Sequence, residues 1–206
     1  MKNLCVLLFC SCLLGAVPLA NAAPSIAGKT GDFSTAKPAP ITRDAKDPLV
    51  LNLMGRTYAM FTSREDEDNS DIWQNGYLPK GVNASLANPR DAILITKNEE
   101  TSCEEEMKDV DLDEILSMDT RLRDDKIISA EITKDGKTDY TVIRCLQAGA
   151  DAFALQVIFP RTTQSDEQWQ QIQRHIFSSV QKTPTNVILD NFVEAVCKFG
   201  SDCRAQ

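Results

Sequence analysis

The cysteines are the residues whose chemistry this sequence constrains most. Three lie in the apolar N-terminal stretch, and four follow it: Cys103, Cys145, Cys197 and Cys203. An even number of cysteines in an oxidising compartment predicts two disulfides, and four cysteines allow three pairings. We favour Cys103 with Cys145 and Cys197 with Cys203, because Gly200 permits the sharp reversal that the shorter loop requires. A zinc site is disfavoured, since the Cys-x-x-Cys spacing is absent and the chain has one distant histidine.

That histidine, His175, is not predicted to be catalytic. General-base catalysis needs a nucleophile within reach of the imidazole and a carboxylate behind it, whereas His175 lies in a glutamine-rich segment typical of a surface helix. The Gly-x-Ser-x-Gly, His-Glu-x-x-His and phosphate-loop motifs are absent. We therefore predict a protein that is not an enzyme and binds no cofactor. A hydrolase that uses paired acids such as Asp109 and Glu114 is the least favoured alternative.

Two acidic runs begin like calcium-binding loops and then depart from that pattern. Asp109-x-Asp111-x-Asp113 is followed by Glu114 where the loop needs glycine, and by Thr120 where it needs a bidentate glutamate. Asp66-x-Asp68-x-Ser70 fails at the same two positions. We therefore expect solvated acidic surfaces and no metal site.

Charge and aromatic residues favour a protein as the partner. The formal net charge of -8 and the isoelectric point near 4.7 disfavour nucleic acid and anionic lipid, whose phosphates attract lysine and arginine. A basic protein is the easier partner for an acidic surface. Trp73, Tyr77 and Leu78 form an apolar cluster beside a polar turn, and exposed clusters of this kind anchor protein interfaces. Burial of these side chains in the core is the alternative.

Residues 1–22 have the features of a secretory signal peptide. A short positive start precedes an apolar run over residues 4–17, and Ala20-Asn21-Ala22 offers the small residues that signal peptidase reads. The run is too short to span a bilayer, so we expect no stable membrane insertion. A lipid anchor is disfavoured, because Cys12 follows Phe9-Cys10-Ser11 rather than a leucine and two small residues. We predict cleavage after Ala22 and a periplasmic or secreted protein.

The rest of the chain divides into a linker and one domain. Residues 23–47 are rich in proline and small residues and predict a flexible linker, and residues 48–206 predict a single globular domain. Strand-like runs at residues 49–63, broken at Gly55, and at 72–78 predict a hairpin, whereas residues 92–96 fit a helix or a strand. A capping box of Ser102 and Glu105 predicts a helix that runs to about Arg123, either continuous or broken near Asp111.

The strongest local pattern is a second hairpin. Residues 127–133 and 138–146 flank Asp135-Gly136, a dipeptide that supplies the positive dihedrals of a tight turn. Alternation places Glu131, Ser129, Tyr140 and Arg144 on one face. We expect the other face to be the buried side, and a Cys103–Cys145 disulfide to tie the helix to it; this face carries Ile128, Ala130, Ile132, Thr141, Ile143 and Cys145. The apolar run 152–159 predicts a central strand covered on both faces.

Two helices are predicted after that strand. Ser165 and Gln168 form a capping box, and the apolar side chains that follow at helical spacing are Trp169, Ile172, Ile176 and Val180. Pro184 begins a further helix that ends at Gly200. The order of elements predicts an α+β fold in which a mostly antiparallel sheet, a hairpin plus a three-stranded meander, packs against two to three helices.

One segment carries a family resemblance. Tyr77-Leu78-Pro79-Lys80-Gly81, followed by a cysteine-bearing meander and a helix, resembles a segment of small uncharacterised exported bacterial proteins. The resemblance implies an exported location and this fold class, and it implies no activity.

Three functions follow from these patterns, in order of preference. We expect an exported, disulfide-stabilised acidic protein that binds another macromolecule, for example as an inhibitor or immunity protein of a basic enzyme or toxin. The second is a carrier of a small molecule or lipid, with an apolar pocket lined by Phe153, Leu155, Val157, Trp169 and Phe192. The third is the carboxylate-dependent hydrolase described above.

Overall fold

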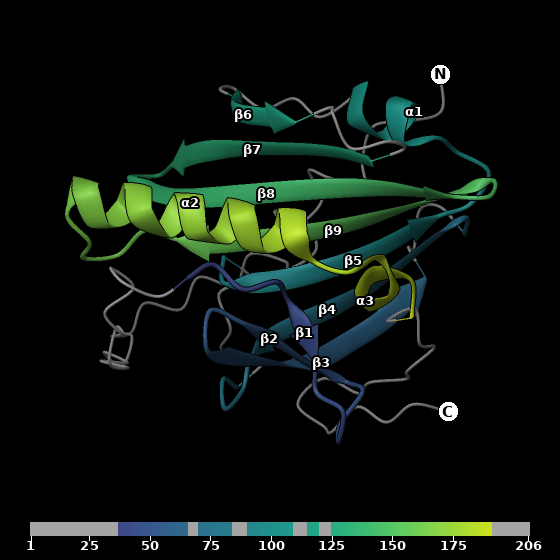
Figure 1. Ribbon diagram of the computed structural model, residues 1–206, viewed down its shortest axis with the longest axis horizontal. Helices are drawn as coiled ribbons and strands as arrows, with labels where there is room; N and C mark the ends of the chain where they lie inside the picture. The colour runs from purple at the N-terminus through teal and green to yellow at the C-terminus, as the bar shows by residue number, and fades with distance from the viewer. Residues whose placement is uncertain (1–36, 66–69, 84–89, 109–114, 120–124, 191–206) are drawn as a thin grey trace.

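The centre of the protein is one continuous antiparallel sheet. The computed structural model describes residues 37–65, 70–83, 90–108, 115–119 and 125–190 (Figure 1). Within these ranges nine strands follow the order β1-β2-β3-β4-β5-β9-β8-β7-β6, and neighbouring strands are antiparallel. The strands are Thr42–Arg43 (β1), Val50–Leu53 (β2), Arg56–Glu65 (β3), Ile72–Pro79 (β4), Ala92–Asn98 (β5), Ile115–Asp119 (β6), Asp125–Lys134 (β7), Lys137–Ala148 (β8) and Asp151–Pro160 (β9).

Two meanders make up this sheet. Strands β1 to β5 form the first, β6 to β9 form the second, and the two join where β5 pairs with β9. The predicted, mostly antiparallel α+β fold agrees with this arrangement, although the sheet is larger relative to the helices than expected. The central position of the predicted apolar strand is confirmed, since β9 lies between β5 and β8 and most of its side chains are buried.

Residues with positive φ shape two of the hairpin turns. Asp135 has a φ of 54° and Gly136 a φ of 70°, and they join β7 to β8 as predicted. Met54 at 53° and Gly55 at 72° play the same part between β2 and β3. Positive φ at both central residues matches the twist of the flanking strands. The second of these turns divides the strand-like run 49–63 into two strands.

Three helices accompany the sheet in the described part of the chain: α1 (Cys103–Lys108), α2 (Asp166–Lys182) and α3 (Thr185–Leu189). Helix α2 lies along β8 and β9 in Figure 1. It begins with the predicted capping box, in which Gln168 N donates to Ser165 Oγ. Its predicted apolar face is confirmed, because Trp169, Ile172, Ile176 and Val180 are buried and belong to the main hydrophobic core with side chains of the sheet.

The helix predicted from Ser102 to about Arg123 is wrong in its second half. Helix α1 begins as expected, but Ile115–Asp119 is strand β6. Strand β6 pairs with β7 and places Ile115 opposite Ala130. The short apolar run fits either structure by itself, and the edge of β7 offers it a ladder of backbone hydrogen bonds. Residues 92–96, which fitted either structure, also form a strand, β5.

The prediction of one buried face on the β7–β8 hairpin is wrong, because both faces are buried. The face with Ile128, Ile143 and Cys145 is buried as expected, except that Ile132, near the hairpin turn, is 36% exposed. The opposite face lies beneath α2, and its Ser129, Tyr140 and Arg144 are at most 6% exposed.

Hydrogen bonds to α2 explain why a polar face is buried. Glu131 Oε2 accepts a hydrogen bond from Trp169 Nε1 at 2.5 Å and another from Gln173 Nε2 at 2.6 Å. Arg144 donates to carbonyl oxygens at the other end of the helix, including that of Thr183 at 2.6 Å. Polar groups that find partners in this way can be buried without a large penalty.

The sheet begins inside the range predicted to be linker. Ile41 is fully buried, its N–H donates to Thr183 Oγ1 at 3.1 Å, and β1 pairs with β2. The predicted signal peptide, together with Cys197 and Cys203, lies outside the described residues. A helix long and apolar enough to cross a membrane is not found in the ranges that the structure describes.

Candidate binding surface at one end of the sheet

Acidic side chains from separate segments gather at one end of the sheet. The ends of β3 and β5 and the starts of β4 and β9 meet there, because neighbouring strands are antiparallel. Glu99 N donates to the Asp71 carbonyl oxygen at 2.9 Å and joins two of these strand ends, and α1 follows shortly after β5. We call this set the acidic end; its members are Glu65, Asp71, Glu99, Glu100, Glu104, Glu105, Glu106 and Asp151.

Most of the acidic end faces solvent. Glu106 and Asp151 are partly buried, and the other members are exposed. Lys97 Nζ lies 2.6 Å from Glu99 Oε1 and 3.3 Å from Asp151 Oδ2, so it holds two of the carboxylates in place. Its hydrogen bond to Glu99 raises the pKa of Lys97 above the ordinary value. Among the described residues of this region, the acidic side chains outnumber the basic ones, which are Arg64, Lys97, Lys108 and Lys126.

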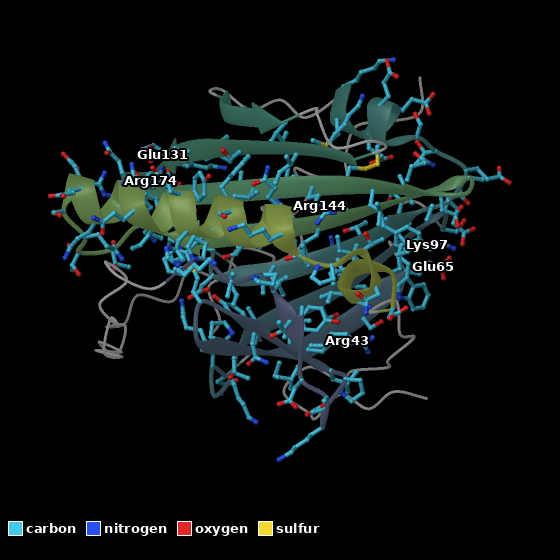
Figure 2. The ribbon with its side chains drawn as sticks, viewed as in Figure 1. Arg43, Glu65, Lys97, Glu131, Arg144 and Arg174 are labelled. Carbon is cyan, nitrogen blue, oxygen red and sulfur yellow. A yellow bond between two sulfur atoms is a disulfide. The ribbon has the colours of Figure 1, made fainter. Side chains whose placement is uncertain are left out.

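Trp73 is the sequence-predicted binding residue that lies within this region. The strand register places it between Glu65 of β3 and Lys97 of β5, so the three side chains share one face of the sheet. Figure 2 shows the labelled Glu65 and Lys97 close together at the right-hand end of the molecule. The indole Nε1 donates to Ser63 Oγ at 3.2 Å, and the side chain is partly exposed. An aromatic ring and several carboxylates therefore meet at one surface.

The structure does not bring Tyr77 and Leu78 to the same surface. Tyr77 is fully buried in the main core, and Leu78 is 3% exposed on the opposite face of β4. Burial raises the pKa of the Tyr77 hydroxyl above its ordinary value. Of the predicted cluster, only Trp73 has the solvent exposure that a docking residue needs.

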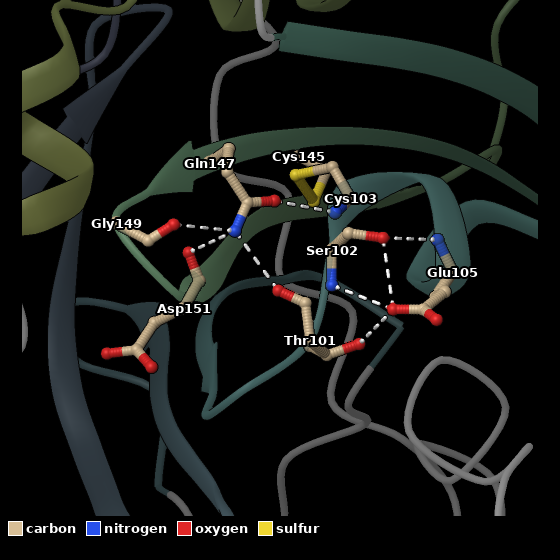
Figure 3. Close-up of a disulfide and its surroundings, with 8 residues drawn as sticks. All are labelled: Thr101, Ser102, Cys103, Glu105, Cys145, Gln147, Gly149 and Asp151. Atoms are coloured by element: carbon tan, nitrogen blue, oxygen red, sulfur yellow. Dashed lines mark hydrogen bonds between the residues drawn. A yellow bond between two sulfur atoms is a disulfide. The ribbon is translucent and has the colours of Figure 1, made fainter.

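Helix α1 contributes a second part of the acidic end. Ser102 and Glu105 form its predicted capping box: Glu105 N donates to Ser102 Oγ at 3.2 Å, and Ser102 N donates to Glu105 Oε2 at 3.2 Å. The bond from Ser102 N is the main cause that lowers the pKa of Glu105 below its ordinary range. The predicted disulfide between Cys103 and Cys145 is confirmed and ties the first residue of α1 to β8 (Figure 3).

Gln147 connects the start of α1 to the turn between β8 and β9. Its Oε1 accepts a hydrogen bond from Cys103 N at 2.9 Å. Its Nε2 lies 3.1 Å from the carbonyl oxygens of Thr101 and Asp151 and 3.3 Å from that of Gly149 (Figure 3). One amide therefore fixes the two parts of the acidic end relative to each other.

The opposite end of the sheet has a different character. There Asp91 accepts a hydrogen bond from Tyr58 Oη at 3.0 Å and pairs with Arg56 at 2.7 Å, and Arg90 pairs with Asp139 at 2.6 Å. Charges of both signs are matched within these pairs. Groups of three or more potential metal ligands are not found among the described residues.

The other candidate residues of the sequence do not form a second site in the described part of the chain. His175 lies partly buried on α2, and its carbonyl oxygen accepts a hydrogen bond from Ser179 Oγ at 2.7 Å. The residues named for an apolar pocket, Phe153, Leu155, Val157 and Trp169, are all members of the main core cluster. Phe192, Asp109 and Glu114 lie outside the described residues, as do the two incomplete calcium motifs in large part.

Gln147 and Lys97 were not singled out from the sequence. Each is a polar residue near the end of a strand that is otherwise mostly buried. A polar residue at such a position indicates a structural hydrogen bond or ion pair.

No protein-family model matches the chain, and no curated protein matches it in sequence. The function is therefore inferred from the residues and their geometry.

Proposed function

We propose that this chain is an exported, disulfide-stabilised acidic protein that binds a basic protein partner through its acidic end. The observation that carries the proposal is the place of Trp73, a partly exposed aromatic side chain in register with Glu65 and Lys97. Tryptophan supplies large contact area at interfaces, and surrounding charges select a partner of opposite sign. An inhibitor or immunity protein of a basic enzyme or toxin is one form of this function.

Charge and location support the same conclusion. The formal net charge is -8, and the acidic end concentrates carboxylates that are mostly exposed. A surface of one sign speeds encounter with an oppositely charged protein, and the effect weakens as salt increases. Residues 1–22 have the pattern of a signal peptide, which supports a periplasmic or secreted location for the mature chain, and a disulfide such as Cys103–Cys145 is stable in such a compartment.

The binding experiment compares two charge reversals that change net charge equally. Glu65→Lys alters the acidic end beside Trp73, and Glu167→Lys alters an exposed residue of α2 near the opposite end of the sheet. The probe is an oligolysine peptide, with oligoglutamate as the control ligand, and affinity is measured by calorimetry at low and moderate salt. We expect Glu65→Lys to weaken oligolysine binding by about tenfold and Glu167→Lys to weaken it less than about twofold.

Equal effects of the two variants would mean that net charge, rather than the acidic end, attracts the cation. A parallel pull-down from periplasmic extract uses the same two variants as bait. A basic protein retained by the wild type and by Glu167→Lys, but lost with Glu65→Lys, is the expected result. If none is retained at low salt, the proposal fails.

A further inference from the structure

Among the described residues, helix α1 is held to the sheet by its disulfide, a small apolar cluster and the hydrogen bonds of Gln147. It spans only Cys103–Lys108, a length at which an isolated helix is marginal in water. Cys103 is its one buried residue. The apolar cluster beneath it consists of Cys103, Cys145 and Ala152, with Met107 partly buried against them. Without a covalent link, this small cluster opposes the full conformational entropy of the segment.

The main core does not depend on α1. Its cluster joins the sheet to α2 and α3 through residues such as Leu155, Trp169 and Ile188, and it contains no residue of α1 and neither of the paired cysteines. Loss of α1 from its place therefore leaves this core intact.

The hydrogen bonds of Gln147 orient the start of α1 and do not replace the covalent link. The amide joins Cys103 N and the Thr101 carbonyl oxygen to the turn between β8 and β9. Bonds of this kind exchange for bonds to water when the segment detaches, so each adds only a modest net stabilisation.

We infer that the Cys103–Cys145 disulfide is a local folding switch for residues 101–108. When both cysteines are reduced to thiols, these residues leave the sheet, while the sheet and α2 keep their structure. When the disulfide is formed, α1 is docked on the sheet. Oxidation joins the two sulfur atoms, and the two protons and two electrons pass to the disulfide of a thiol oxidant, which leaves as a dithiol. The acidic end is then complete only after oxidation, a consequence that rests on the proposed function.

The test is amide hydrogen exchange measured by mass spectrometry on the full chain purified from an oxidising compartment. The switch variant is Cys103→Ala/Cys145→Ala, and the matched control is Cys197→Ala/Cys203→Ala. In the switch variant we expect residues 101–108 to exchange at the rate of an unfolded chain, at least about tenfold faster than in the wild type. Peptides from β9 and α2 should remain protected, and the control variant should keep α1 protected.

Two outcomes would overturn the inference. Continued protection of residues 101–108 in the switch variant would show that packing and hydrogen bonds suffice to hold α1. Loss of protection throughout β9 and α2, or failure of the variant to fold, would show that the disulfide supports the whole fold rather than one segment. A second experiment needs no substitution: the folded wild type is reduced and alkylated, and the amide hydrogen exchange of residues 101–108 is measured again.

Oligolysine binding to the same proteins separates this inference from the proposed function. If the oxidised wild type does not bind oligolysine, the proposed function fails, while the exchange result still decides the switch. If the wild type binds and the folded switch variant binds equally well, the switch does not govern the acidic end.

Discussion

At the scale of single residues, Glu105 is the carboxylate that closes the capping box at the start of α1. Its Oε2 accepts hydrogen bonds from Ser102 N at 3.2 Å and from Ser102 Oγ at 3.1 Å. These bonds are stronger to the ionised carboxylate than to the neutral acid, so the pKa of Glu105 in the folded chain lies below its ordinary value of about 4.5. The stabilisation is therefore complete above that ordinary pKa and is lost as the pH falls through the lower, folded value.

This linkage gives a pH-dependent prediction for the start of α1. We expect the Ser102 amide resonance to shift, and its exchange to accelerate, as the pH falls from about 4.5 downward. Nuclear magnetic resonance of the labelled chain measures both. Glu105→Gln keeps the geometry of a capping box and removes the titrating group, so it should abolish the pH dependence. A dependence that persists in Glu105→Gln would assign the effect to another carboxylate.

At the scale of elements, α2 is anchored by a buried arginine from the sheet. Arg144 is 6% exposed, and its Nη1 lies 3.2 Å from the carbonyl oxygen of Val180 and 2.6 Å from that of Thr183. A cation at this position donates to carbonyl groups at the end of the helix, and it complements the helix dipole.

Removal of this arginine should destabilise the fold. We expect Arg144→Met to lower the free energy of unfolding by about 3 kcal/mol, because buried carbonyl oxygens lose their donor. Arg174, on the exposed side of the same helix, is the matched control, and Arg174→Met should change stability by less than about 0.5 kcal/mol. Urea denaturation measures both variants. Similar losses in the two would contradict the anchoring role of Arg144.

The same elements show what the sequence could predict. Strong local signals succeeded: the Asp135-Gly136 turn, the Ser165 capping box and the apolar face of α2 are all confirmed. Two predictions that depended on long-range partners failed, namely the exposed face of the β7–β8 hairpin and the helix over residues 115–119. Arg144 and Glu131 were assigned to the side away from the core by their charge, and only the packing of α2 on the sheet reveals their hydrogen-bond partners. Ile115–Asp119 likewise becomes a strand because β7 presents an edge.

The candidate site was also predictable only in part, because local patterns reveal residue types but not which strands lie side by side. Trp73 and the acidic character of the chain were visible in the sequence. Their meeting at one end of the sheet depends on the antiparallel order of β3, β4, β5 and β9, which local patterns do not specify. The Cys103–Cys145 pair was favoured because the short loop at Gly200 suits a link between the other two cysteines, and the structure confirms the Cys103–Cys145 pair.

At the scale of the whole molecule, the two predicted disulfides restrain the unfolded chain by different amounts. Cys103 and Cys145 are 42 residues apart in sequence, so their link removes much of the freedom of the unfolded chain and stabilises the native state by up to about 4 kcal/mol. The link predicted between Cys197 and Cys203, which lie outside the described residues, closes a short loop and should contribute about 2 kcal/mol.

Urea denaturation of the two double-alanine variants tests this difference. We expect Cys103→Ala/Cys145→Ala to lose about twice as much unfolding free energy as Cys197→Ala/Cys203→Ala. Mass spectrometry of the wild type after digestion without reductant should show both links. A loss of global unfolding free energy is compatible with a local switch. The disulfide lowers the entropy of the unfolded state, whereas undocking of α1 changes the folded state. The two variants could instead lose equal unfolding free energy, or Cys197→Ala/Cys203→Ala could lose more. Either result would show that strain or native contacts outweigh the chain entropy of a loop whose ends are 42 residues apart.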